Sequence, residues 1–222
     1  MTAVTAFELA TSSLTDALTR SVTERIVSGQ IAPGEKVTEA RLAGDYGVAR
    51  PTARACLERL VVLGLLRRSV HKTAVVPVLG VREIEDLFFT RQTVEGAAVA
   101  ELARRSSVPS AAEAAQVAIE AAAAAEDFRG QVAADIAFHV ALVEGVGSER
   151  LRRMHELIIG EVHLTMGLHE AHRTTSGRKV AAEHARVLRA VKAGDVAKAQ
   201  DALAAHLESA RLRVVDRASR TA

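Results

Sequence analysis

The sequence has little of three features that mark particular classes of protein: cysteines, long apolar runs and the start of a secreted chain. Its single cysteine, Cys56, cannot form a disulfide within the chain, which suits a reducing compartment. No run of about 18 or more apolar residues occurs, which excludes a membrane-spanning helix. The first residues lack the basic and apolar regions of a signal peptide. We therefore expect a cytoplasmic protein without a membrane partner.

Charge is nearly balanced overall, at +2, but it is distributed unevenly along the chain. Residues 1–80 contain 10 Lys and Arg against 7 Asp and Glu, whereas residues 81–222 contain 19 against 20. The net charge of +3 in the first part is a mild indication of nucleic-acid binding. Seven of the eight histidines lie after residue 130, so the second part has the larger supply of metal ligands.

Apolar spacing and turn residues predict a small DNA-binding fold over residues 13–78, after a flexible arm of residues 1–12. The predicted elements are a helix over 13–28, a turn over 31–37, helices over 39–46 and 50–63, and a hairpin of 65–70 with 73–78. Thr38 is expected to cap the second helix, and Pro51 is tolerated in the first turn of the third. This order is typical of a winged helix-turn-helix.

The rest of the chain, from Val81 onward, shows no strand signal. The candidate helices are 81–106, 110–128, 130–146, 149–173, 177–193 and 195–217, separated by Pro109, Gly130, Gly147, Gly177 and Gly194. The predicted fold class is therefore mainly α: a winged helix-turn-helix with a small β-hairpin, followed by an all-α helical bundle over residues 81–217.

The third predicted helix has the features of a recognition helix, whose first residues contact base edges in the major groove. Arg50, Thr52 and Arg54 fall in its first turn and a half, and the two arginines share a face. Arginine is the commonest reader of guanine. Further candidate DNA contacts are Arg41 in the preceding helix and the wing residues Arg67, Arg68, His71 and Lys72. A single arginine is more often only solvated, but the helix order and the wing together favour double-stranded DNA.

The segment IVSGQIAPGEKVTEARLAGDYGVARPTARACLERLVVLGLL resembles the DNA-binding domain of the GntR family of transcription regulators. The matching residues are Gly29, Pro33, Gly34, Leu42, Ala43, Gly47, Val48, Arg50, Arg54, Leu57, Leu60, Gly64 and Leu65. Ala49 replaces the usual capping Ser or Thr, and Ala55 stands where glutamate is common. The resemblance implies a homodimer that binds a palindromic operator.

The second part contains a candidate metal site. Asp135 and His139 are one helical turn apart and project from one face, so they can bind one ion together. His139, His184 and His206 each lie in an apolar stripe of a different predicted helix. Helix bundles build metal sites where such stripes meet. Any one of these histidines alone is better explained as a buried core imidazole or a surface side chain.

The segments RQTVEGAAVAELA, DIAFHVALVEGVGSERL and EHARVLRAVKAGDVAKAQDALAAHL resemble the FCD sensor domain of the FadR-like GntR subfamily. The resemblance implies that Asp135, His139, His184 and His206 bind a divalent metal ion. Zinc is the expected ion, with nickel and manganese as alternatives that suit the same ligands.

One carboxylate and three imidazoles leave coordination positions open for water or for the carboxylate of a small organic acid. Arg91 and His163 are the candidate effector contacts, although Arg91 has an equal claim to an internal ion pair with Glu95. His155, which shares a face with His163, is expected to be structural or exposed.

These features together predict a ligand-responsive transcriptional repressor rather than an enzyme. A regulator that senses the metal itself is one alternative. A metal-dependent hydrolase is another, but the sequence offers no convincing general base for it and no role for the N-terminal domain.

Overall fold

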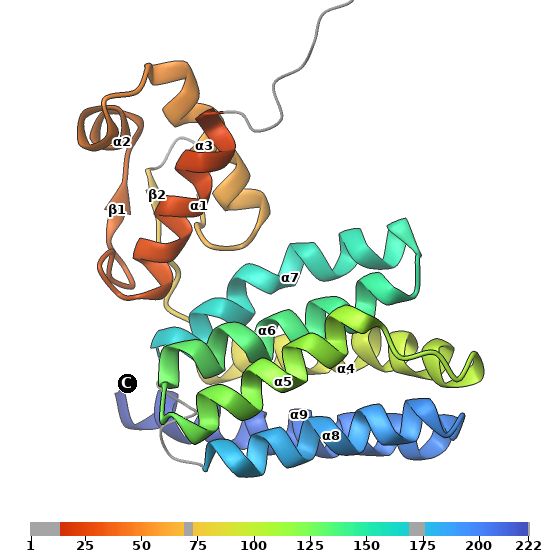
Figure 1. The fold of residues 1–222 in the computed structure, drawn as a ribbon. Coiled ribbons are helices and arrows are strands. Elements are labelled where there is room, and N and C mark those ends of the chain that lie inside the picture. Colours follow the sequence, from red (N-terminus) through yellow and green to blue (C-terminus); the bar gives the residue numbers. More distant parts are fainter. Residues whose placement is uncertain (1–13, 69–72, 169–175, 222) are drawn as a thin grey trace, which may run out of the picture.

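The computed structural model describes residues 14–68, 73–168 and 176–221, and most of them are helical (Figure 1). The elements are α1 (Leu14–Val27), β1 (Lys36–Val37), α2 (Glu39–Tyr46), α3 (Arg50–Val62), β2 (Ala74–Val75), α4 (Val81–Arg104), α5 (Ser110–Ala124), α6 (Phe128–Gly145), α7 (Glu149–Leu168), α8 (Gly177–Lys192) and α9 (Val196–Thr221). The mainly α fold class, with a winged helix-turn-helix before a helical bundle, is confirmed.

Local sequence explains the helix-turn-helix well. The Thr38 side chain accepts a hydrogen bond from the Arg41 backbone N–H at 3.1 Å and so caps α2. Gly47 ends α2 in the left-handed conformation, at φ 63°. Pro51 stands in the first turn of α3, and no side chain caps that helix because Ala49 occupies the capping position. Both predicted helices therefore begin at the predicted residues.

The strand pairing of the wing differs from the predicted hairpin. Strand β2 pairs antiparallel with β1, in the register Lys36 with Val75 and Val37 with Ala74. The first strand of the predicted hairpin contributes a single bridge, between Arg67 and Val75. Residues 36–37 were expected to continue a turn, because two residues are too few to show an alternating pattern.

In the bundle, the helix boundaries differ most between α5 and α6. Gly130 was expected to separate these helices, but it lies in the first turn of α6. The Asp127 side chain accepts a hydrogen bond from the Gly130 N–H at 3.0 Å, so the cap forms three residues before the glycine. Helix α5 ends earlier than predicted, at Ala124, and Glu126 takes a positive φ of 54° in the connection.

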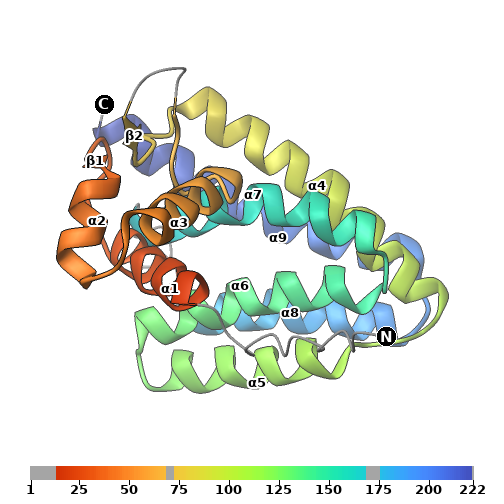
Figure 2. The same ribbon diagram turned by 90° about the horizontal axis from the view of Figure 1, so that it is seen from above.

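The winged helix-turn-helix sits over one end of the bundle, where it contacts α7 (Figures 1 and 2). It has its own apolar core around Val22, Ile26 and Leu60, and Leu164 of α7 belongs to the same cluster. A larger cluster joins α4, α5, α6, α8 and α9 below. None of the helices in the described part of the chain combines the length and the apolar character that a membrane crossing requires.

Candidate metal centre and nucleic-acid interface

Helix α3 presents its predicted recognition residues as expected from their spacing. Arg50 and Arg54 are exposed, and Thr52 is half-buried. The opposite face is buried in the domain core, including Cys56 and Leu57. Among the described residues, Arg54 forms two loose surface ion pairs, 3.3 Å to Glu58 and 3.8 Å to Glu39. Surface pairs of this kind are weak, so a phosphate or a guanine can replace them at little cost.

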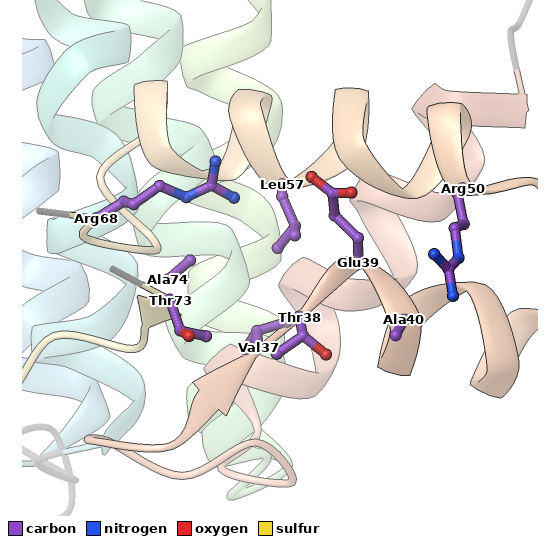
Figure 3. Close-up of a pocket in the computed structure, with 9 residues that line it drawn as sticks. All are labelled: Val37, Thr38, Glu39, Ala40, Arg50, Leu57, Arg68, Thr73 and Ala74. Carbon is purple, nitrogen blue, oxygen red and sulfur yellow. The ribbon is translucent and has the colours of Figure 1, made fainter. Parts of the chain in front are cut away.

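A groove of about 280 Å³ runs between α3, the start of α2 and the wing (Figure 3). Arg50 and Arg68 lie at its two ends, with Glu39 and Leu57 between them. The groove thus has a positive side chain at each end, Arg50 at the N-terminal turn of α3 and Arg68 at the opposite end, with the acidic Glu39 between them. This arrangement suits a nucleic-acid backbone better than an isolated arginine would.

The remaining predicted DNA contacts differ in their surroundings. Arg41 is half-buried and pairs with Glu35, with an N–O distance of 2.6 Å, so it already has a partner within the domain. Arg67 contacts Glu83 and also Glu161, the latter at 3.0 Å, and so joins the wing to the bundle. His71 and Lys72 lie outside the described residues.

In the bundle, the four predicted metal ligands meet at one point. Asp135 and His139 come from α6, His184 from α8 and His206 from α9, and all are at most 2% exposed. Their ligand atoms lie within 4.8 Å of one another. The Nε2 atom of His206 is 3.2 Å from that of His139 and 3.1 Å from that of His184. The Asp135 carboxylate approaches His184 Nε2 at 3.4 Å.

Two buried glutamates orient the histidines from behind. Glu95 of α4 accepts a hydrogen bond from His139 Nδ1 at 2.6 Å, and Glu183 of α8 accepts one from His206 Nδ1 at 3.0 Å. Each Nδ1 therefore carries the proton, and each Nε2 presents a lone pair to the centre of the cluster. Such carboxylate–histidine pairs are the usual outer shell of a metal site.

The electrostatics of the cluster favour a neutral His206 beside an ionised Glu95. Burial, followed by the influence of His139, lowers the pKa of His206 to about 3. Burial would raise the pKa of Glu95, but Arg91 and the imidazoles of His139 and His155 outweigh it and hold this pKa well below its ordinary value. A neutral imidazole at His206 is the form that can bind a metal ion.

The spacing of the nitrogens fits a bound cation. Lone pairs of His139 and His206 face each other at 3.2 Å, which is unfavourable unless a positive charge lies between them. Two nitrogens that each lie about 2.1 Å from one metal ion are roughly 3.0–3.4 Å apart. The observed distances of 3.1 and 3.2 Å fall in this range. The donor set of three imidazoles and one carboxylate suits zinc, nickel or manganese.

Cationic side chains with unused hydrogen-bond donors lie beside the cluster. Arg91 is 1% exposed and donates from Nε to Glu95 at 2.8 Å, but its Nη2 has no hydrogen-bond partner among the described residues. In the same part of the chain, Nε and one Nη of Arg213 are also buried without a partner. Arg213 reaches back along α9 to Ser209 at 2.7 Å, which directs its guanidinium toward the turn that holds His206.

His163 lies elsewhere, in a cavity of about 670 Å³ between α1, the start of α6 and α7. Val132 and Ile136 of α6 form part of its apolar wall, and Glu24 and Arg129 lie at its polar edge. Burial lowers the pKa of His163 to about 4. The structure therefore separates the two predicted effector contacts, because Arg91 lies beside the buried Asp and His cluster and His163 faces the DNA-binding domain.

Sequence reasoning missed the residues that act through contacts with distant segments. Glu183 precedes His184 directly and therefore lies on another face of α8, so the ligand pattern gives no reason to select it. Arg213 follows His206 by seven residues, which places both on one face, and this spacing was an unused signal. His155 is buried with its Nε2 3.5 Å from Glu95, which its position in α7 alone does not indicate.

Comparison with known families assigns both parts of the chain. Residues 14–76 match the family described as bacterial regulatory proteins, gntR family. Residues 86–209, more than half of the chain, match the FCD domain. The second match contains all four residues of the buried cluster, and the first contains Arg41, Arg50, Thr52 and Arg54.

Individual relatives agree with this assignment. The HTH-type transcriptional regulator LutR of Bacillus subtilis (strain 168) is 26% identical over 203 residues, covering 82% of this chain and 92% of LutR. A GntR transcriptional regulator from Rhodococcus sp. RHA1 has a similar crystal structure, with a TM-score of 0.77 and 23% identity over 92% of this chain and 99% of that one. The E. coli protein McbR/YncC gives a TM-score of 0.76 and 20% identity, over 95% and 100%. At these identities the structural likeness concerns the fold.

Proposed function

Since the chain belongs to the gntR family of DNA-binding transcription regulators and carries an FCD domain, we propose that this domain senses a small carboxylate through a bound divalent metal ion. The observation that carries the proposal is the buried cluster of Asp135, His139, His184 and His206. Three buried imidazoles and a carboxylate without an ion would be a costly substitute for apolar packing.

We assign residues 13–78 to DNA binding and residues 81–217 to sensing and dimerisation, with residues 1–12 as an arm. Arg50, Thr52 and Arg54 would contact base edges, while Arg41, His71 and Lys72 would contact the DNA backbone. A homodimer with two-fold symmetry fits a palindromic DNA operator. We place this regulator in the cytoplasm. Light scattering of the full chain at micromolar concentration is expected to give the mass of a dimer, and a monomer would contradict this part of the proposal.

The ion would be held by Asp135, His139, His184 and His206, with zinc as the expected species. When bound, it would supply a Lewis-acidic position that attracts a carboxylate oxygen. Glu95 and Glu183 would fix the orientation of two ligand imidazoles, as their hydrogen bonds already do. Because both glutamates are engaged in this way, they support a binding site better than a hydrolytic one, which needs a free general base.

The charge of the site defines the class of effector. Its charged side chains in the described part of the chain are the carboxylates of Glu95, Asp135 and Glu183 and the guanidiniums of Arg91 and Arg213. They sum to a single negative charge, and a divalent ion changes the sum to a single positive charge. A monocarboxylate neutralises it, and the unused donors of Arg91 and Arg213 can hold its oxygens.

The proposal is tested by calorimetric titration of the zinc-loaded protein with small monocarboxylates, dicarboxylates and tricarboxylates. We expect a monocarboxylate to bind most tightly, and Arg213→Met to weaken it about tenfold or more. Arg211→Met is the matched control, because Arg211 lies on the same helix but pairs with Glu208 at the surface. Equal binding by the Arg213→Met and Arg211→Met proteins would contradict the assignment of Arg213.

We further propose that the effector relieves repression. An effector shifts DNA binding only if it binds one domain arrangement better than the other. The operator affinity of the zinc-loaded protein should therefore fall when the monocarboxylate is added. A rise in affinity on the same titration would identify an activator or co-repressor mechanism instead.

A further inference from the structure

Helix α7 contacts both functional sites and lies between the DNA-binding domain and the rest of the bundle (Figure 1). In its second turn, His155 is 3% exposed and places Nε2 3.5 Å from Oε1 of Glu95. The other oxygen of Glu95 accepts the hydrogen bond from His139 at 2.6 Å. One carboxylate therefore stands between a metal ligand and α7.

Gly160 lies one and a half turns farther along α7, against the end of α3. A Cβ atom at Gly160 would come 1.9 Å from the backbone oxygen of Leu63 and 2.9 Å from the side chain of Leu65. No other residue fits there without moving the two domains apart. Glycine inside a helix costs about 1 kcal/mol relative to alanine. Its presence is thus explained by the close approach of α7 to the DNA-binding domain.

The next turn of α7 continues this contact. Glu161 accepts a hydrogen bond from Arg67 of the wing at 3.0 Å. Leu164 is 1% exposed and belongs to the apolar core of the DNA-binding domain. Arg67 also contacts Glu83 at the start of α4, so the wing is attached to two bundle helices. Any rotation or shift of α7 would therefore move packed groups of the DNA-binding domain.

We propose that α7 transmits occupancy of the metal site to the DNA-binding domain, with His155 and Gly160 as its positioning residues. The inference rests on the proposed metal site. An ion at the cluster fixes His139 and with it the Glu95 carboxylate, which then holds His155 at one distance. Without the ion, Glu95 can redistribute between His139, His155 and Arg91. Residues 155 and 160 are about 7.5 Å apart along a rigid helix. A change in the position of His155 between the metal-bound and metal-free states therefore also moves Gly160 against Leu63 and Leu65.

The test is hydrogen exchange of the full chain, loaded with zinc or treated with a chelator. Zinc should slow exchange in residues 60–66 and 158–166 of the wild type by about fivefold or more. His155→Leu should keep its zinc but lose this response. His155→Gln should restore it, because a glutamine Nε2 can donate to Glu95 from nearly the same position. A purely structural role for His155 would lower stability in both variants without this selective rescue.

Gly160→Ala tests the other end of the helix. We expect it to keep its zinc and to show fast exchange in residues 60–66 in both states, because the added methyl group forces the domains apart. Gly44→Ala is the control, since a Cβ at this helical glycine meets nothing within 4 Å. It should respond to zinc as the wild type does.

An equal zinc response in the wild type and His155→Leu proteins overturns the inference. Bound zinc without any response in residues 60–66 of the wild type does so too. If the wild type binds no zinc, the proposed function fails and the inference fails with it. If the wild type binds zinc but residues 60–66 do not respond, only the inference fails.

Discussion

The two domains place their functional side chains in opposite environments. On α3 the candidate DNA contacts Arg50 and Arg54 are exposed, and Arg54 keeps 65% of its side chain accessible. In the bundle, Asp135 and His184 are fully buried, and Glu95 and Arg91, which lie behind His139, are at most 1% exposed. The DNA-binding domain thus carries its function on the outside of an apolar core. The sensor domain has replaced part of its core with charged and polar groups.

This difference has an energetic consequence. Removing an exposed arginine leaves the apolar cluster around Val22 and Leu60 intact. Buried imidazoles and carboxylates, by contrast, stabilise the fold only while each has a partner. Stability should therefore depend on the metal site and hardly at all on the DNA-binding face.

The largest expected effect is that of metal removal. With free zinc at about 1,000 times its dissociation constant, chelation should lower the free energy of unfolding by about 4 kcal/mol. Urea denaturation of the loaded and the chelated protein measures the change. Arg50→Ala should alter the same quantity by less than about 0.5 kcal/mol. Similar losses from chelation and from Arg50→Ala would remove the contrast between the two domains.

Operator binding should show the reverse pattern. Arg50→Ala and Arg54→Ala should each cost about 1–3 kcal/mol of operator affinity, because each removes a base contact. Fluorescence anisotropy with an operator duplex measures this at fixed salt concentration. Neither variant should change the zinc content. Full operator affinity in both variants would show that α3 does not read the bases through these arginines.

Sequence reasoning succeeded where the signal is local. Thr38, Gly47 and Pro51 mark helix ends through their own backbone and side-chain chemistry, and all three lie where expected. The four residues of the buried cluster could be grouped because each histidine lies on the apolar face of its own helix and Asp135 shares a face with His139, and helical faces follow from spacing alone.

Contacts between distant segments could not be predicted in this way. The pair of His139 with Glu95 spans 44 residues, and the strand pair of Lys36 with Val75 joins segments whose packing no local pattern specifies. Arg91 was left between an effector contact and an ion pair with Glu95. The structure shows the ion pair, together with a second nitrogen that has no partner among the described residues.

A smaller effect, on zinc affinity, is expected from changing a group that orients one of the proposed ligands. Glu183→Gln keeps the shape of the side chain but weakens its hold on His206, so the zinc dissociation constant should rise about 10–100-fold. Competition with a coloured chelator measures the constant. Glu208→Gln is the matched control, because Glu208 is an exposed acid on the same helix as His206. Equal constants for the two variants would mean that Glu183 does not orient the ligand.

The smallest effect concerns His163, at the boundary between the domains. Its pKa is about 4 in the folded protein, below the value near 6.5 of an unfolded chain. The unfolded state therefore binds the proton first, and stability present above pH 6.5 is lost as the pH falls toward 4. The loss is at most about 1.4 kcal/mol for each pH unit. Between pH 7 and pH 5, the free energy of unfolding of His163→Gln should fall less than that of the wild type. An equal fall in both proteins would mean that another group is responsible for the loss of stability.

The most direct test of the buried metal site is the metal content of the purified chain, after chelation and reloading with zinc. Elemental analysis of the wild type should give about one zinc ion per chain. His184→Ala and His206→Ala should bind little or none, while Arg50→Ala should match the wild type. Full zinc content in both histidine variants, or none in the wild type under any loading condition, would contradict a metal centre at Asp135, His139, His184 and His206.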